Sequence, residues 1–119
     1  MTVLLEITEE WHDDVPVLRL DGEIDVANVE EIRSRMRALV TNRALALVVD
    51  LSPTTYLDSA GINLLFATGE EMRGRQQQLY VVLPEASPVV RMVTLTGLDQ
   101  ALPTFGSLEE ALAAAAGRR

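Results

Sequence analysis

Residues 44–49 (ALALVV) are apolar at every position, and this segment constrains the fold more than any other feature of the sequence. Side chains alternate between the two faces of a strand, so a strand with apolar residues at all positions must be covered on both faces. Residues 79–83 (LYVVL) form a second segment of this kind, and a stretch with helical spacing separates the two. This arrangement is typical of a parallel sheet with helices on both faces.

Periodicity predicts further elements on either side of the two buried strands. Residues 3–8 and 17–21 alternate as half-buried strands do, and the polar residues around 12–14 predict a turn between them. Residues 102–105 could form a short edge strand. Apolar residues at three- and four-residue steps predict helices that begin near residues 29, 58, 89 and 108.

Polar residues before two of these helices predict their caps. Asp25 or Asn28 can cap the first helix, and Asn28 has capping-box spacing with Glu31. Ser107 and Glu110 have the same spacing at the start of the last helix. We therefore expect a capping box at each of these two helix starts.

The predicted order of elements is β-β-α-β-α-β-α-β-α. It indicates an α/β fold with a mixed β-sheet, in which an antiparallel hairpin comes first and parallel strands with right-handed crossover helices follow. We expect residues 1–119 to form a single domain, with residues 113–119 as a frayed tail.

Composition excludes several classes of function. The chain has no cysteine, and its net charge of -8 disfavours direct binding to nucleic acid or to anionic membranes. All ten basic residues are arginine, so chemistry that depends on a lysine is excluded. The apolar runs are too short to span a membrane, and the first residues lack the basic start of a signal peptide. We therefore expect a cytoplasmic protein that needs no cofactor.

The sequence does not show the residue patterns of the common catalytic sites. The single histidine, His12, falls in the predicted turn, and Ser59 does not lie in a G-x-S-x-G motif, which argues against a serine hydrolase. Asp50 and Asp58 lie at the two ends of one loop, but Asp13 and Asp14 precede a strand, unlike the acidic pocket of a receiver domain. We predict no catalytic residue and no metal site.

Residues 48–62 carry the strongest local signal, because a buried strand leads through a polar loop into a helix. Asp58 and Ser59 can be read simply as capping residues at the start of that helix. A serine hydroxyl at a helix N-terminus is also a good phosphate acceptor, because free backbone N–H groups and the positive end of the helix dipole lie there.

The sequence resembles the STAS domain family, and within it the bacterial anti-sigma factor antagonists. The resemblance covers nearly the whole chain and lies in residues 21–25 (DGEID), 49–52 (VDLS), 58–62 (DSAGI) and a C-terminal part from residue 98 to residue 112. Two residues depart from the family pattern. Thr54 stands where an apolar residue is common, and Pro53 makes the loop stiffer, so the packing of this loop is in question.

The resemblance implies a protein-binding switch. In that reading Ser59 is phosphorylated by an anti-sigma factor that is a serine/threonine kinase and supplies the ATP. The unphosphorylated chain captures this kinase and frees its sigma factor. Carried onto this sequence, the partner-binding residues are Glu23, Asp25, Asp58, Ala60, Gly61 and Asn63. A phosphoserine phosphatase as a further partner stays open, and a STAS subunit that docks on a transporter ATPase is the alternative function.

Overall fold

The computed structural model describes residues 4–41 and 44–117 of the 119-residue chain. Within these residues no helix is long and apolar enough to cross a membrane. The elements in chain order are β1 (Leu5–His12), β2 (Val15–Ile24), α1 (Val29–Leu39), β3 (Ala46–Asp50), β4 (Thr54–Leu57), α2 (Ser59–Gly74), β5 (Gln78–Val82), α3 (Val90–Thr96), α4 (Leu98–Ala101), β6 (Thr104–Phe105) and α5 (Leu108–Ala116).

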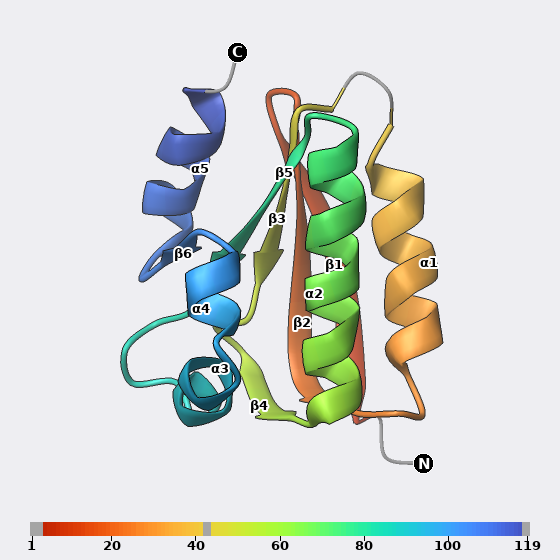
Figure 1. The fold of residues 1–119 in the computed structure, drawn as a ribbon, viewed down its shortest axis with the longest axis vertical. Coiled ribbons are helices and arrows are strands. Elements are labelled where there is room, and N and C mark those ends of the chain that lie inside the picture. Colours follow the sequence, from red (N-terminus) through yellow and green to blue (C-terminus); the bar gives the residue numbers. More distant parts are fainter. Residues whose placement is uncertain (1–3, 42–43, 118–119) are drawn as a thin grey trace.

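The strands form one mixed sheet, as the sequence predicts (Figure 1). Its order is β1-β2-β3-β5-β6, and β4 pairs with β2 outside this path. The hairpin of β1 and β2 is antiparallel, and every other pair is parallel. The carboxyl ends of the parallel strands therefore lie at one end of the sheet, and the loops that follow them are brought together there.

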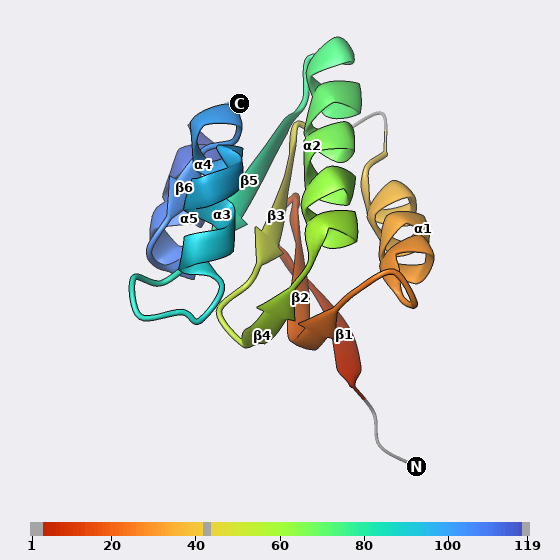
Figure 2. The same cartoon turned by 60° about the horizontal axis from the view of Figure 1, so that its bottom comes forward.

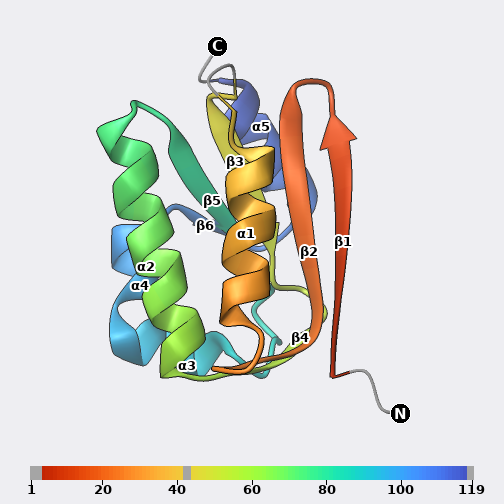
Figure 3. The same cartoon turned by 90° about the vertical axis from the view of Figure 1, so that its right-hand side faces the viewer.

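Helices cover both faces of the sheet, and the fully buried β3 lies between them. Figure 1 shows α5 on one side of the sheet and α2 with α1 on the other, and Figure 3 shows α1 and α2 side by side. Residues that face α1 and α2 form the larger hydrophobic core, which includes Leu18, Leu47 and Val49. The alternate residues Val17 and Val48 belong to the second core, under α5. Side chains on both faces of β3 are thus buried.

The strand β4 is absent from the sequence prediction, which treats residues 54–57 as a loop. β2 pairs with β3 through residues 17–19 and then with β4 through residues 22–24. The four residues of β4 are too few for a periodic signal, and only Thr54 and Leu57 are buried. Pairing with a distant segment, which local sequence does not reveal, makes this segment a strand. The helix α4, of four residues, is likewise missing from the prediction.

The expected capping box at α1 is not formed. Asn28 occupies the N-cap position, but its side chain does not cap the helix. Its Oδ1 accepts a hydrogen bond from the Asp25 N–H instead, and its Nδ2 donates to the Glu23 carbonyl. At α5 the predicted N-cap is confirmed, because the Ser107 hydroxyl accepts a hydrogen bond from the Glu110 N–H at 3.2 Å. Competition from the preceding loop explains the difference at Asn28.

The expected frayed tail is helical for part of its length, so that prediction is wrong there. The helix α5 continues to Ala116, and Ala115 is only 3% exposed. The small alanine side chains give a weak periodic pattern, yet they allow α5 to approach the sheet closely. Residues 118 and 119 of the predicted tail lie outside the described residues, as does Val3 of the first predicted strand.

Candidate functional site

The loop between β2 and α1 and the start of α2 meet at the end of the sheet (Figures 1 and 3). The N–H of Asp58 donates to the carbonyl of Ile24 at 3.2 Å. In the parallel pair of β2 and β4, Glu23 is opposite Tyr56 and Ile24 is opposite Leu57. The structure thus brings together the two segments that the sequence marks as partner-binding.

Gly22 makes this arrangement possible. Its φ is +124°, a backbone conformation that residues other than glycine rarely adopt. A Cβ atom here would lie 2.0 Å from the carbonyl oxygen of Leu4. The register of β2 with β4 shifts between Gly22 and Glu23. At this irregularity the Gly22 N–H donates to the Pro53 carbonyl, and the Glu23 N–H donates to the Leu4 carbonyl. Gly22 therefore fixes the path of the end of β2, which carries Glu23, and of the following loop, which carries Asp25.

The first turn of α2 gives Asp58 and Ser59 different roles. Asp58 is the N-cap, and its Oδ1 accepts from the N–H of Ala60 at 2.9 Å and of Gly61 at 3.2 Å. Ser59 is the first helical residue and is exposed. The reading of both residues as caps thus holds for Asp58 alone. The backbone N–H groups expected to be free for a phosphate at Ala60 and Gly61 are occupied by the Asp58 carboxylate.

The other predicted contact residues of α2 differ in accessibility. Asn63 is exposed and Ala60 is half-buried, whereas Gly61 is buried. A Cβ atom on Gly61 would lie 2.4 Å from Leu57 Cδ1 and 2.8 Å from Ile24 Cγ2. Gly61 therefore lets the first turn of α2 pack closely against the ends of β2 and β4, and this packing holds the site in position.

The loop between β2 and α1 is held by side chains as well as by the sheet. Asn28 bridges the Asp25 N–H and the Glu23 carbonyl at 3.0 and 2.8 Å, and Asp25 Oδ1 accepts from the Ala27 N–H at 2.9 Å. Sequence reasoning assigned Asn28 only to the helix and missed this role. A side-chain bond that spans a loop of this kind has no periodic signal in the sequence.

The two residues that depart from the family pattern fit the loop. Thr54 is 1% exposed, and its hydroxyl donates to the Leu20 carbonyl at 2.6 Å. The Pro53 carbonyl accepts the Gly22 N–H at 3.1 Å. A polar side chain at position 54 is thus satisfied within the protein, and the loop remains well packed.

The site is acidic. Within the described residues, the ion pairs of the arginines are made with other carboxylates, and none involves Glu23, Asp25 or Asp58. Asp50 does not contribute, because it is 3% exposed and bonds to Arg19 Nε at 3.1 Å and to Ser52. The three carboxylates Glu23, Asp25 and Asp58 therefore give this end a negative charge that suits a basic partner surface.

Among the residues that the structure describes, neither a histidine nor a group of metal ligands lies beside Ser59. The single histidine, His12, ends β1 at the hairpin with β2, whereas Ser59 follows the opposite end of the sheet (Figure 1). In the described part of the chain, no three carboxylates or histidines are grouped so that they could hold a metal ion. The arrangement offers an exposed hydroxyl next to carboxylates, which can accept a modifying group.

Comparison with known proteins decides the family. The profile of the STAS domain matches residues 6–111. This chain belongs to the STAS domain family. The anti-sigma-F factor antagonist RsfB of Mycobacterium tuberculosis is 32% identical over 115 residues, which cover 97% of this STAS domain and 93% of RsfB. The anti-sigma-B factor antagonist of Listeria monocytogenes is 25% identical over 99 residues, which cover 83% of this chain and 85% of the relative.

A solved structure agrees with the fold of this STAS domain. The crystal structure of an anti-sigma factor antagonist from Mycobacterium paratuberculosis has a TM-score of 0.83 and 34% identity, with 94% of each chain covered. The predicted mixed α/β fold and the resemblance on which the site residues were assigned are both confirmed at the level of the family.

Proposed function

We propose that this STAS domain is an anti-sigma factor antagonist whose binding is switched by phosphorylation of Ser59. The unphosphorylated chain binds an anti-sigma factor that is a serine/threonine kinase, and the sigma factor is released. Relatives that cover almost the whole chain carry the name of anti-sigma factor antagonist, which supports this class of function. ATP and the catalytic groups belong to the partner, so the chain itself acts without catalysis, in the cytoplasm.

The observation that carries the proposal is the exposure of Ser59 on the first turn of α2, beside the end of β2 with Glu23 and the following loop with Asp25. In the reaction, Oγ of Ser59 forms a bond to the γ-phosphorus of ATP as the bond to the leaving group ADP breaks, and a base of the kinase takes the hydroxyl proton. The exposed residues Ser59 and Asn63 and the half-buried Glu23, Asp25, Asp58 and Ala60 would contact the partner directly. Gly61 would contribute through its backbone.

The local electrostatics explain how one modification can prevent binding. Phosphorylation adds about -1.5 to -2 charge units at neutral pH, next to the Asp58 carboxylate. Asp58 already accepts from the N–H groups of Ala60 and Gly61, so the phosphate finds little compensation at the helix start. A partner pocket that has closed on the unmodified serine, with no basic group opposite the hydroxyl, would have to bury unpaired charge, at a cost of several kcal/mol.

Phosphate transfer and binding measurements test this switch. Wild type, Ser59→Ala and Ser59→Glu are incubated with the recombinant cognate kinase and ATP, the phosphate is located by mass spectrometry, and each form is titrated against the kinase. We expect phosphate only on Ser59 and an affinity about 100-fold lower for the phosphorylated form, equivalent to roughly 2.7 kcal/mol. Ser59→Ala should bind as wild type, and Ser59→Glu should lie between. Equal affinities of the two forms would refute the proposal.

A substitution at Asn63 tests the position of the contact surface. Because Asn63 is exposed near Ser59, Asn63→Arg should weaken kinase binding by steric conflict, while stability changes by no more than about 0.5 kcal/mol. Ala113→Arg, also exposed but in α5 on the other side of the sheet, is the matched control and should bind as wild type. If both variants bind equally well, the surface lies elsewhere. Capture of a transporter ATPase in place of a kinase would favour the alternative function.

A further inference from the structure

We propose that the groove between β4 and α3 binds an apolar segment of the same anti-sigma factor, and that this contact does not depend on phosphorylation. The proposal rests on the proposed function and adds to it a second part of the interface. None of the partner-binding residues assigned from the sequence lies in this groove. Its main side chains are Tyr56 and Leu57 of β4, Pro88 before α3, and Arg91, Met92 and Leu95 of α3.

The groove exposes apolar side chains that the fold itself does not use. Its volume is about 320 Å³. Tyr56 is 49% exposed, Met92 is 36% exposed and Leu95 is 73% exposed. Single exposed apolar residues are common on protein surfaces and need no explanation. Several large apolar side chains around one groove are uncommon, and such a group marks a binding surface.

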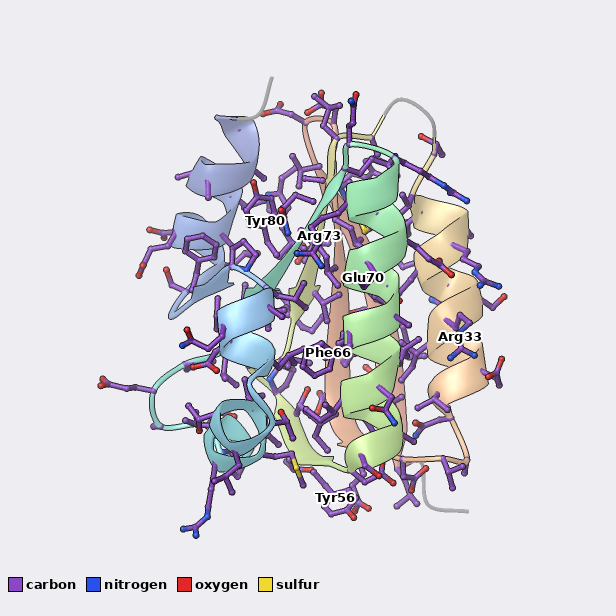
Figure 4. All side chains as sticks on the ribbon, in the orientation of Figure 1. Arg33, Tyr56, Phe66, Glu70, Arg73 and Tyr80 are labelled. Carbon is purple, nitrogen blue, oxygen red and sulfur yellow. The ribbon has the colours of Figure 1, made fainter. Side chains whose placement is uncertain are left out.

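The groove is continuous with the surface around Ser59. Tyr56 is separated from Ser59 by two residues, and the N–H of Asp58 donates to the carbonyl of Ile24, the residue between Glu23 and Asp25. Figure 2 shows β4 next to α3, and Figure 4 shows Tyr56 projecting beside the first turn of α2. Val26, which follows Asp25 in the chain, is also exposed, at 75%. A partner that covers Ser59 therefore has apolar surface within reach.

Charge distinguishes the groove from the rest of the interface. The Ser59 surface carries the carboxylates of Glu23, Asp25 and Asp58, whereas the groove carries the exposed arginine Arg91. Among the ion pairs of the described residues, none involves Arg91. The occupant that fits is a segment of the anti-sigma factor with apolar side chains for the groove and an acidic residue for Arg91. Basic residues of the same partner would face the carboxylates of Glu23 and Asp25, away from the Ser59 hydroxyl.

This division predicts how the two parts of the interface combine. Phosphorylation of Ser59 alters charge at the helix start and leaves the apolar groove unchanged. Loss of groove contacts should therefore lower the affinity of the unmodified and the phosphorylated chain by the same factor. A change confined to the Ser59 surface should instead alter the ratio between the two forms, because contacts far enough apart add independently.

The test compares exposed apolar residues at two ends of the molecule. Met92→Gln and Leu95→Gln are titrated against the recombinant cognate kinase, each with Ser59 and with Ser59→Glu as the weakened form. We expect about a 5- to 30-fold loss for each groove variant in both backgrounds, as for a residue at the centre of an interface. Leu45→Gln is the control, because Leu45 is 42% exposed and precedes β3 at the opposite end of the sheet. It should bind as wild type, and thermal unfolding should show that all variants are folded.

The outcomes separate this proposal from the proposed function. If wild type does not bind the kinase, the proposed function fails. If wild type binds and Asn63→Arg weakens binding while both groove variants bind normally, the groove proposal alone is overturned. Sedimentation of the isolated chain is the second measurement. A dimer that Leu95→Gln dissociates would show that a second copy fills the groove, and this also overturns the proposal.

Discussion

At the scale of single residues, the adjacent side chains of Asp58 and Ser59 have different roles at the start of α2. The Asp58 carboxylate caps the helix through two backbone N–H groups, and Ser59 leaves its hydroxyl exposed at the first helical position. A serine that capped the helix could not be modified without loss of that cap. Because Asp58 performs this task, Ser59 can carry a phosphate while the helix keeps its start.

Stability measurements on Asp58→Ala and Ser59→Ala test this separation. Loss of the N-cap in Asp58→Ala should lower the free energy of unfolding by about 0.5–2 kcal/mol. Ser59→Ala should change it by no more than about 0.5 kcal/mol, because the side chain is exposed and alanine favours the helix. Urea unfolding followed by circular dichroism gives both values. An equal loss in the two variants would show that the serine hydroxyl also stabilises the helix start.

A second prediction concerns Thr54, whose buried hydroxyl donates to the Leu20 carbonyl. Thr54→Val keeps the shape of the side chain but removes this bond, and should lower the free energy of unfolding by roughly 1–3 kcal/mol. The neighbouring Thr55 is exposed, so Thr55→Val should stay within about 0.5 kcal/mol of wild type. Chemical denaturation measures both. Wild-type stability of Thr54→Val would show that the hydrogen bond contributes nothing to the fold.

At the scale of elements, the site depends on how closely α2 approaches the strand ends. Gly61 leaves no room for a side chain between α2 and the residues Leu57 and Ile24. The short strand β4 then runs straight into the cap at Asp58. The position of Ser59 relative to Glu23 and Asp25 is therefore set by packing between α2, β4 and the end of β2.

Two alanine substitutions in α2 should have opposite effects. Gly61→Ala must displace Leu57 and Ile24, and should lower the free energy of unfolding by about 1–3 kcal/mol. Gly74→Ala, at the other end of the helix, meets no atom within 4 Å and should raise it by about 0.4–1 kcal/mol. Thermal and urea unfolding of both variants check these signs. A stabilised Gly61→Ala would contradict the close packing of α2 on the sheet.

At the scale of the whole molecule, the sheet separates two hydrophobic cores. α1 and α2 cover the larger core, which adjoins the site, and α5 covers the smaller one on the other face. In the smaller core the rings of Tyr80 and Phe105 are 5.8 Å apart, and Ala111 is fully buried. Figure 4 shows Tyr80 between the sheet and α5. Since β3 contributes to both cores, loss of either should destabilise the whole sheet.

Substitutions in α5 test this coupling at a distance from Ser59. Ala111→Gln overfills the smaller core and buries an amide without partners, so it should lower the free energy of unfolding by roughly 2–5 kcal/mol. Ala113→Gln, exposed on the same helix, should change it by no more than about 0.5 kcal/mol. Unfolding followed by Trp11 fluorescence and by far-ultraviolet circular dichroism should give the same single cooperative transition. Independent transitions would contradict a single cooperative unit.

The sequence alone determined the class of fold, because residues 44–49 and 79–83 are apolar at every position, a pattern typical of strands in a sheet covered on both faces. Local patterns also located the main helices and the Ser107 cap, and they placed Ser59 at the start of α2. These signals are short in range, since periodicity and capping depend on neighbouring residues.

Tertiary structure decided the features that link distant segments. The strand β4 and the burial of Gly61 arise from contacts of α2 and β4 with the end of β2. The same contacts bring Tyr56 beside α3 and open the groove next to Ser59. Local sequence cannot specify them, because their free energy comes from residues that approach one another only when the chain has folded.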